Sequence, residues 1–334
     1  MKMRKKIGVI LSLFLSIMVL GACSSKTAQK ENKESSEKKT VKVCVPDGVP
    51  SLSIAKMIKE NPSIDKNIQI KYEVEKTPDI LASKVLKKEA DIAIVPSNLS
   101  AQAYNKNLPY KLAATSGFGS FFLVSSEKFE NFNDLKGKEI YSMGKGLTPD
   151  IVFKNILNKN NINPDKDVNI KYLNAATELA PAFISGKAKI AIIPEPMLSK
   201  VLMKKKDSKI SFDLNKEWMK INNNKLGYPQ SSLIVKKELL DNNKDFINGF
   251  LDKYKDSVNW ANNKPEDLSK YAKELKLNIK DDKIIKNAIK RANMKYTNIN
   301  DSKKEYKDYF KVLAESNPKS IGGKIPDEGL YMEK

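Results

Sequence analysis

The stretch Ala90-Asp-Ile-Ala-Ile-Val-Pro96 has a close counterpart later in the chain, Ala188-Lys-Ile-Ala-Ile-Ile-Pro194. Each is a short apolar run that ends at a proline, a pattern typical of a fully buried strand leading into a loop. Ser97 and Asn98 follow the first stretch, and Glu195 follows the second. Because the two prolines lie 98 positions apart (194 − 96), the pattern indicates that a larger unit is repeated.

The neighbouring segments repeat in the same order. Ile70-Lys71-Tyr72 precedes the first stretch, and Ile170-Lys171-Tyr172 precedes the second. Each copy also has a predicted helix, Pro78–Lys88 or Thr177–Ser185, and an upstream predicted strand with a glycine-containing loop, Val41–Val45 or Glu139–Met143. Two β-α-β-α-β units of this kind predict an α/β fold with parallel sheets and right-handed crossovers. Ligands of such sheets bind outside the carboxyl ends of the strands.

The chain is predicted to cross twice between the two units. The segment 116–120 contains two glycines before an apolar strand, and the segment 228–230 precedes the strand Ser231–Val235, which we expect to return to the first unit. A length of 334 residues is typical of two domains. We therefore expect lobe one to comprise residues 41–118 plus 230–334, and lobe two residues 119–229. A plain loop at 116–120 is the alternative. The end of the chain reads as a helical region with a buried stripe: Phe246, Phe250, Tyr254 and Val258.

The first 22 residues read as a signal peptide, with a basic start and the apolar stretch Ile7–Leu20. Its end, Leu20-Gly21-Ala22-Cys23, resembles the box of bacterial lipoproteins, in which the cysteine receives acyl chains such as palmitate. Two acyl chains suffice for stable anchoring. A chance cysteine at an ordinary cleavage site is the alternative. Residues 23–40 are polar and are expected to form a flexible tether.

The composition argues against several classes of protein. The net charge is +20, or +16 without the four basic residues of the signal peptide (20 − 4), but the lysines are spread beside acidic residues and no nucleic-acid motif is present. Histidine is absent, which removes the commonest general base and metal ligand. Cys44 lies in an apolar strand and reads as a core residue. These features argue against a nucleic-acid partner, a hydrolase and a metal receptor, and predict no cofactor.

Several motifs together resemble one family. They are the Cys23 signal, Asp47-Gly48, Asp91-Ile-Ala-Ile, Asp134-Leu-Lys-Gly-Lys, Pro194-Glu195-Pro196, and Trp260 followed by Asn262 and Pro265-Glu266. This pattern is similar to the extracytoplasmic solute-binding proteins of ABC importers, in the nitrate/sulfonate/taurine and thiamine-precursor group. The resemblance covers roughly Val41 to Glu315. It implies the two-lobed, type II periplasmic-binding-protein-like fold, a lipid-anchored monomer, and an ABC permease with its ATPase as partners. It does not identify the solute.

Loops at the predicted strand ends supply the candidate ligand-binding residues. They are Asp47, Gly48, Ser97, Asn98 and Phe118 of lobe one, Lys145, Thr148, Asn174 and Glu195 of lobe two, and Tyr228 and Gln230 of the second crossing. The loop Gly144-Lys145-Gly146 before a helix start is expected to offer free backbone N–H groups to an anion. A flexible lysine in a glycine-rich turn is the alternative.

The two carboxylates among these candidates favour a different ligand. Asp47 and Glu195 would disfavour a simple anion such as nitrate, unless they only cap helices or form ion pairs. An anion seat opposite a carboxylate suits a zwitterion such as an amino acid or amino sulfonate. A carboxylate with Phe118 or Tyr228 suits an aminopyrimidine. A transport receptor is the favoured function, and a lipid-anchored enzyme and a surface adhesion or interaction protein are the alternatives.

Overall fold

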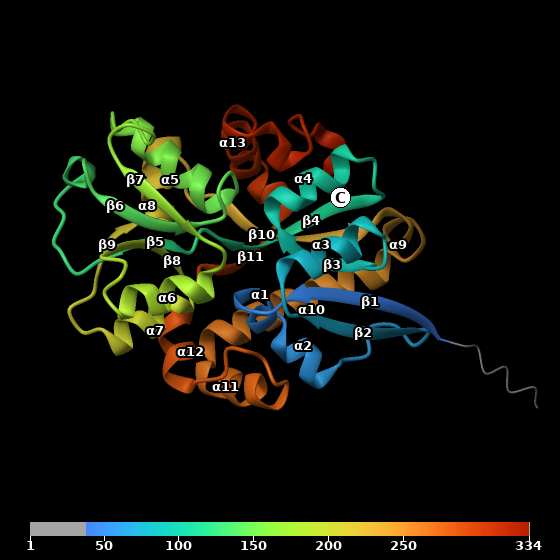
Figure 1. The fold of residues 1–334 in the computed structure, drawn as a ribbon. Helices are drawn as coiled ribbons and strands as arrows, with labels where there is room; N and C mark the ends of the chain where they lie inside the picture. The colour runs from blue at the N-terminus through green and yellow to red at the C-terminus, as the bar shows by residue number, and fades with distance from the viewer. Residues whose placement is uncertain (1–37, 334) are drawn as a thin grey trace, which may run out of the picture. The chain divides into compact units, whose positions relative to one another are not determined.

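The structure is a computed structural model, and it describes residues 38–333. The predicted signal peptide, Cys23 and nearly all of the predicted tether lie outside the described residues. Two mixed β-sheets with helices on both faces form the α/β fold, which confirms the predicted fold class (Figure 1). We call the elements around the first sheet lobe one and those around the second sheet lobe two; the exact lobe boundaries stay a prediction.

The first sheet has the strand order β11-β4-β10-β3-β1-β2. Its strands are β1 (Lys39–Pro46), β2 (Ile68–Glu75), β3 (Ile92–Pro96), β4 (Tyr110–Phe118), β10 (Pro229–Lys236) and β11 (Met294–Asn298). β1 pairs in parallel with β2 and β3, as the repeat predicts, because a helix follows each of these strands and returns the chain to the same edge. β10 pairs antiparallel with β3 and β4.

The second sheet repeats this arrangement with the order β7-β6-β8-β5-β9. Its strands are β5 (Phe121–Ser125), β6 (Glu139–Met143), β7 (Asn169–Leu173), β8 (Ile190–Pro194) and β9 (Lys209–Asp213). β6 pairs in parallel with β7 and β8, and β5 pairs antiparallel with β8 and β9. Each sheet therefore contains one strand, β10 or β5, that enters directly after a crossing from the other lobe.

Helices cover both faces of each sheet (Figure 1). Those of the first half are α1 (Val49–Ser53), α2 (Ala55–Glu60), α3 (Pro78–Leu86), α4 (Ser97–Asn105), α5 (Thr148–Lys159), α6 (Ala176–Ile184) and α7 (Met197–Lys204). They are followed by α8 (Leu214–Asn222), α9 (Lys237–Asn242), α10 (Lys244–Asn263), α11 (Pro265–Glu274), α12 (Asp282–Ile289) and α13 (Ile299–Ser316). The predicted stripe of α10 is buried, and it packs in one core with β1 and β10. Within residues 38–333, no helix has the length and apolar character needed to cross a bilayer.

Three local features are visible only in the structure. The N-cap of α4 is Pro96, so Ser97 and Asn98 belong to the helix and do not cap it with their side chains. The edge strand β11 was not predicted, because its five residues include only one buried apolar side chain, Met294. Regular structure also continues beyond Gly322-Gly323, through a 3₁₀ turn at Glu328–Leu330 and a bridge from Tyr331 to Leu112.

Candidate functional site

The two crossings lie against each other. The first passes from β4 to β5 through Gly119, and the second enters β10 through Gly227 and Tyr228. The Gly119 N–H donates to the Tyr228 carbonyl at 3.0 Å, and the Asn293 side-chain amide donates to the Gly119 carbonyl. A Cβ on Gly119 would overlap the Tyr228 ring, so glycine is required for this close approach. The crossings are thus hydrogen-bonded and tightly packed.

A small hollow of about 30 Å³ lies beside these crossings. Its lining residues belong to α1, the end of β4, the first crossing, the start of β10 and the segment after α12. They are Val49, Pro50, Ser53, Ser116, Gly117, Phe118, Ser120, Gln230, Ser231 and Ala292. A volume of this size holds about two water molecules. A larger solute does not fit into this volume. Phe118 and Gln230 are the sequence-predicted candidates that the structure places in this lining.

Paired polar groups line the hollow. Gln230 forms two bonds with Ser120, since the Ser120 N–H donates to Gln230 Oε1 at 2.9 Å and Gln230 Nε2 donates to Ser120 Oγ at 3.1 Å. Ser116 Oγ donates to Ser231 Oγ at 2.7 Å. The Ser53 hydroxyl lies 2.8 Å from the hydroxyl of Tyr254. These serines were not among the candidates predicted from the sequence. Ser116 and Ser120 are, however, the first and last residues of the glycine-containing segment 116–120 that was predicted to form the first crossing.

The other candidates of lobe one have partners within their own lobe. Asp47 accepts hydrogen bonds from Ser51 Oγ at 3.2 Å and from the Asn278 N–H at 3.0 Å, so it holds the start of α1 against the loop after α11. Gly48 precedes that helix with φ 128°, a conformation that favours glycine. Ser97 is fully buried and bonds to Ser232 at 2.7 Å, whereas Asn98 donates to the Ser320 carbonyl.

The loop Gly144-Lys145-Gly146 is already occupied by a carboxylate of the chain. The Gly146 N–H donates to Asp150 Oδ2 at 2.7 Å, and the Tyr172 hydroxyl donates to Asp150 Oδ1 at 2.6 Å. Asp150 is 2% exposed. The expectation of free N–H groups in this loop was therefore wrong for Gly146, because a side chain three residues into α5 takes the bond. Burial, and next the bond to Asp150, raise the pKa of the Tyr172 hydroxyl.

The remaining candidates near this loop lie apart from the hollow's lining. Lys145 is exposed, with its ammonium 5.7 Å from the centroid of the Tyr172 ring. Thr148 Oγ1 lies 2.6 Å from the hydroxyl of Tyr309 on α13, which links lobe two to lobe one. Asn174 is exposed. Their contact with a solute stays a prediction.

Glu195 forms an ion pair between the lobes. Its Oε1 accepts from Arg291 Nε at 2.6 Å, and its Oε2 accepts from the Ser199 N–H at 3.1 Å in the first turn of α7. Arg291 also donates to Ser199 Oγ at 2.9 Å. Burial raises the pKa of Glu195, and the Arg291 guanidinium acts in the opposite direction. Glu195 therefore has the capping and ion-pairing role that was the alternative to solute binding.

Arg291 was missed by sequence reasoning, although a signal was present. Arg4 and Arg291 are the only arginines of a chain with 60 basic residues. A guanidinium offers several donors in one plane, so a single arginine can join Glu195 and Ser199 where a lysine would make one point contact.

Tyr228 is a packing residue. It is fully buried, meets Trp218 edge-on at 5.6 Å between ring centroids and stacks with Tyr309 at 6.3 Å. Burial raises the pKa of its hydroxyl. The structure therefore does not bring Tyr228 into the hollow, and stacking of a solute on this ring has no support in the geometry.

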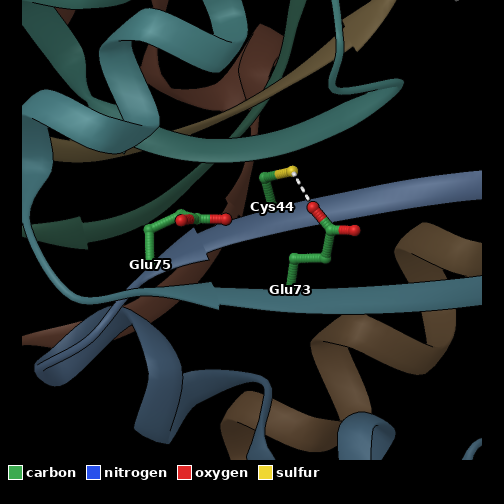
Figure 2. Close-up of side chains that lie close together, drawn as sticks. All are labelled: Cys44, Glu73 and Glu75. Atoms are coloured by element: carbon green, nitrogen blue, oxygen red, sulfur yellow. Dashed lines mark hydrogen bonds between the residues drawn. The ribbon is translucent and has the colours of Figure 1, made fainter.

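A separate cluster in lobe one contains Cys44, Glu73 and Glu75, whose ligand atoms lie within 4.8 Å of one another (Figure 2). The Lys84 ammonium bonds to both carboxylates, at 2.7 Å to Glu73 Oε2. Burial, and next the Glu73 charge, raise the pKa of the Cys44 thiol to about 12. Because the thiol stays protonated and the carboxylates are paired with Lys84 and, at 2.9 Å from Glu73, with Lys71, this cluster is a group of ion pairs and a poor metal site.

The sequence profile of the family described as NMT1/THI5 like matches residues 65–268, more than half of the chain. The chain belongs to this family. A crystal structure described as an ABC transporter from Parabacteroides distasonis superposes with a TM-score of 0.76 at 29% identity, over 89% of this chain and 100% of that one. YtlA of Bacillus subtilis, named as a binding protein, is 33% identical over 129 residues, which cover 36% of this chain and 38% of YtlA.

More distant structures share the fold. The periplasmic aliphatic sulphonate-binding protein SsuA of Escherichia coli has a TM-score of 0.71 at 13% identity, over 89% of this chain and 93% of its own. The periplasmic nitrate-binding protein NrtA of Synechocystis PCC 6803 has a TM-score of 0.58 at 10% identity, over 85% of this chain and 84% of its own. The family match and these relatives confirm the predicted resemblance to the solute-binding proteins of ABC importers, and the relatives that are named for a role are binding proteins and not enzymes.

Proposed function

We propose that this protein is a lipid-anchored receptor that collects a small polar solute on the extracytoplasmic face of the membrane and delivers it to an ABC import permease. The observation that supports a solute site is the hollow beside the two crossings, where serine hydroxyls and the Gln230 amide line a space at the edge of the first sheet at which β1 and β4 end. In a two-sheet α/β fold this is where ligands bind. Phe118 and Gln230 would contact the solute, with Asp47 and Gly48 at the start of α1 beside them.

Opening and closing of the lobes about residues 116–120 and 228–230 belongs to the same proposal. Two adjacent crossings can act as a hinge, and hinge closure around a ligand is a common motion of receptors with this architecture. The hollow of about 30 Å³ is too small for a solute larger than about two water molecules, which supports a cycle in which the lobes open to admit it.

The lipid anchor is proposed from the sequence alone. Leu20-Gly21-Ala22-Cys23 resembles the lipoprotein box, and the polar segment to residue 40 is long enough to hold the folded lobes away from a bilayer.

The experiment that tests the receptor function is mass spectrometry of small molecules released when the protein purified from its own cells is denatured. We expect one solute at near-stoichiometric amount. Solution scattering of the stripped protein should then give a smaller radius of gyration when that solute is added back. A released molecule that neither rebinds nor changes the scattering curve would contradict the proposal.

A further inference from the structure

A second and larger hollow, which we call the outer pocket, lies at the end of lobe one that faces away from the crossings. Its volume is about 340 Å³, compared with about 30 Å³ beside the crossings. Small-molecule sites usually enclose about 300–1,000 Å³. The lining residues belong to the end of α4 and the loop after it, the start of β4, the start of α9 and the C-terminal segment, and none of them lines the hollow beside the crossings. The proposed solute site therefore leaves the outer pocket without a role.

The two hollows lie at opposite ends of β4. Tyr110 at the start of this strand lines the outer pocket, and Phe118 at its end lines the hollow beside the crossings. Eight residue steps of about 3.3 Å each place these two residues roughly 26 Å apart. Figure 1 shows α9 and the C-terminal end of the chain on the side of lobe one away from lobe two. A ligand in the outer pocket is therefore not enclosed between the lobes.

Hydrogen bonds hold the walls of the outer pocket in place. Asn105 Nδ2 at the end of α4 donates to the Ile321 carbonyl at 2.7 Å and to the Lys324 carbonyl at 2.6 Å. The Lys111 ammonium at the start of β4 donates to the Gly329 carbonyl. The C-terminal segment is thus fixed against α4 and β4, and the pocket is preformed, as is usual for small-molecule sites.

Positive charge dominates the outer pocket. Its lining includes the ammonium groups of Lys111, Lys237 and Lys324 and one carboxylate, that of Asp327, which is an excess of two positive charges (3 − 1). Lys324 is exposed, and Lys111 donates to a neutral carbonyl. Lys237 lies 2.5 Å from the Asp241 carboxylate, but both side chains are more than half exposed, and an exposed pair of this kind separates at little cost. Three cationic donors from separate segments therefore line one concave surface.

The Asp327 carboxylate does not make the pocket a cation site. It accepts from the Tyr104 hydroxyl and from the Gly329 N–H at 2.9 Å. The bond from Tyr104, and next the bond from the Gly329 N–H and two lysine charges, hold the pKa of Asp327 below its usual range. Because the protein itself already stabilises this negative charge, a bound cation would meet the excess positive charge of the lysines.

The predicted tether enters the folded part of the chain at the same edge of lobe one. β1 begins at Lys39, whose ammonium donates at 3.2 Å to Oδ1 of Asn243, the residue directly after α9. α9 begins at Lys237 of the pocket lining, and its six residues span about 9 Å. An anchor at Cys23 would therefore bring the phosphate headgroups of a bilayer within reach of the outer pocket.

We propose that the outer pocket is a second binding site, which takes a phosphate-bearing anion. The ammonium groups bind the phosphate, for which lysine is a common partner, and its one or two negative charges offset the excess positive charge. Leu108 and Pro109 offer apolar surface to the organic part of the ligand. A lipid headgroup and a soluble phosphorylated molecule share this chemistry. The site does not depend on the proposed receptor function, because the two hollows share no lining residue.

Calorimetry of the mature protein with matched probes tests the ligand class. Glycerol 3-phosphate and glucose 6-phosphate are monoesters, glycerophosphoglycerol is the diester of a lipid headgroup, and glycerol and glucose are the uncharged counterparts. We expect only the phosphate-bearing probes to bind, with an affinity that falls as the salt concentration rises. Tighter binding of the diester identifies a lipid headgroup as the source, and tighter binding of a monoester identifies a soluble molecule. Equal binding of an uncharged counterpart, or no binding of any phosphate-bearing probe, would overturn the inference.

Substitutions of two lysines assign the binding to the outer pocket. The double variant Lys111→Gln with Lys324→Gln should weaken phosphate binding at least tenfold, because it removes two of the three cationic donors. Lys136→Gln with Lys187→Gln, at exposed positions of lobe two, removes the same charge and should bind like the parent. Parent-like binding by the first pair would place the phosphate elsewhere and refute the site.

Asp327→Asn tests the same site with a change in the opposite direction. The amide oxygen still accepts from Tyr104, but the negative charge is absent, so phosphate should bind at least threefold more tightly. Unchanged or weaker binding would contradict the proposal. This variant decides if the double lysine variant does not fold.

Discussion

Gly119 is the residue on which the packing of the two crossings depends most. A Cβ at this position would overlap the Tyr228 ring and the Asn215 side chain, both of which belong to buried residues with few ways to move. Gly117 lies two residues earlier on β4, and a Cβ there would meet the Asn293 carbonyl at 3.6 Å, an ordinary contact. Two glycines of one short segment therefore have different structural requirements.

Gly119→Ala should lower the free energy of unfolding by about 1–3 kcal/mol, the usual cost of overpacking a filled core. Gly117→Ala should change it by less than about 0.5 kcal/mol, as is usual where no feature is disturbed. Urea unfolding followed by circular dichroism measures both. Equal effects of the two substitutions would mean that the crossing relaxes around Gly119 more easily than the packing indicates.

Glu73 should make the stability of lobe one depend on acid pH. Its bond to Lys84, and next its bond to Lys71, lower its pKa from 4.5 to about 2. Because the folded state holds the ionised form more strongly than the unfolded chain does, this stabilisation is present above pH 4.5 and is lost as the pH falls toward 2.

Glu73→Gln should therefore reduce the loss of stability between about pH 5 and about pH 3, because the substituted side chain cannot take up a proton. Urea unfolding at several pH values measures this slope. Glu89→Gln, at an exposed glutamate of the same lobe, is the control and should keep the parent's slope. A Glu73→Gln slope as steep as the parent's would show that the bond to Lys84 does not govern acid unfolding.

At the scale of elements, α7 and the segment after α12 hold the lobes together through Glu195 and Arg291. The Glu195 side chain has no exposed surface, whereas that of Arg291 is 26% exposed. Removing one partner of a buried ion pair leaves the other charge unpaired, at a typical cost of about 3–5 kcal/mol when it stays buried. Separating the lobes would hydrate Glu195 and relieve that cost.

Arg291→Met should therefore shift the solute-free protein toward an open arrangement. Solution scattering should show a larger radius of gyration than that of the parent, with Lys290→Met at the exposed neighbouring position as the control. Adding Glu195→Gln to Arg291→Met should reverse part of the increase, since the unpaired charge is removed. Superimposable curves for Arg291→Met and the parent would exclude the ion pair as a determinant of closure.

For the molecule as a whole, the two lobes share one apolar core on the side of α13. Tyr309 of α13 packs with Trp218 of α8 and with Tyr228, and all three are fully buried. On the side of the molecule away from α13, α7 of lobe two lies beside α12 (Figure 1). The ion pair of Arg291 and Glu195 also joins the two lobes. We expect the lobes to move about the aromatic cluster, because separating three buried rings is costlier than hydrating one ion pair.

The whole-molecule prediction that follows from the sequence is membrane attachment through Cys23. Cys23→Ala should leave the protein unprocessed or release it from the membrane fraction, because no acyl chains can be added. Detergent partitioning and the intact mass of the mature protein measure both outcomes. Cys44→Ala, which removes a buried thiol of β1, is the matched control and should stay in the membrane fraction. An unchanged mass and partitioning of Cys23→Ala would rule out the anchor.

The sequence by itself determined the repeated β-α-β-α-β units, most helices and the α/β fold class. These depend on local patterns, since apolar runs that end at Pro96 and Pro194, and helices between them, are visible within short windows. Glycines and a returning apolar strand are also local signals, and they predict where the chain crosses between the lobes. The strand order in each sheet could not be predicted from local patterns. In the first sheet, for example, β10 lies between β3 and β4 although it is more than 100 residues away from both in the sequence.

Only the tertiary structure decided which polar groups of the predicted site have partners within the protein. A local pattern places Glu195 and Gly146 at strand ends, but their hydrogen-bond partners depend on what the folded chain brings to them. Arg291 reaches Glu195 across 96 positions of sequence, and Asp150 turns back onto Gly146. The carboxylate and the N–H group that were expected to bind a solute are therefore hydrogen-bonded within the protein. The polar side chains that line the hollow are serine hydroxyls and one glutamine amide. Long-range pairing of charges therefore determines whether a predicted binding group stays free.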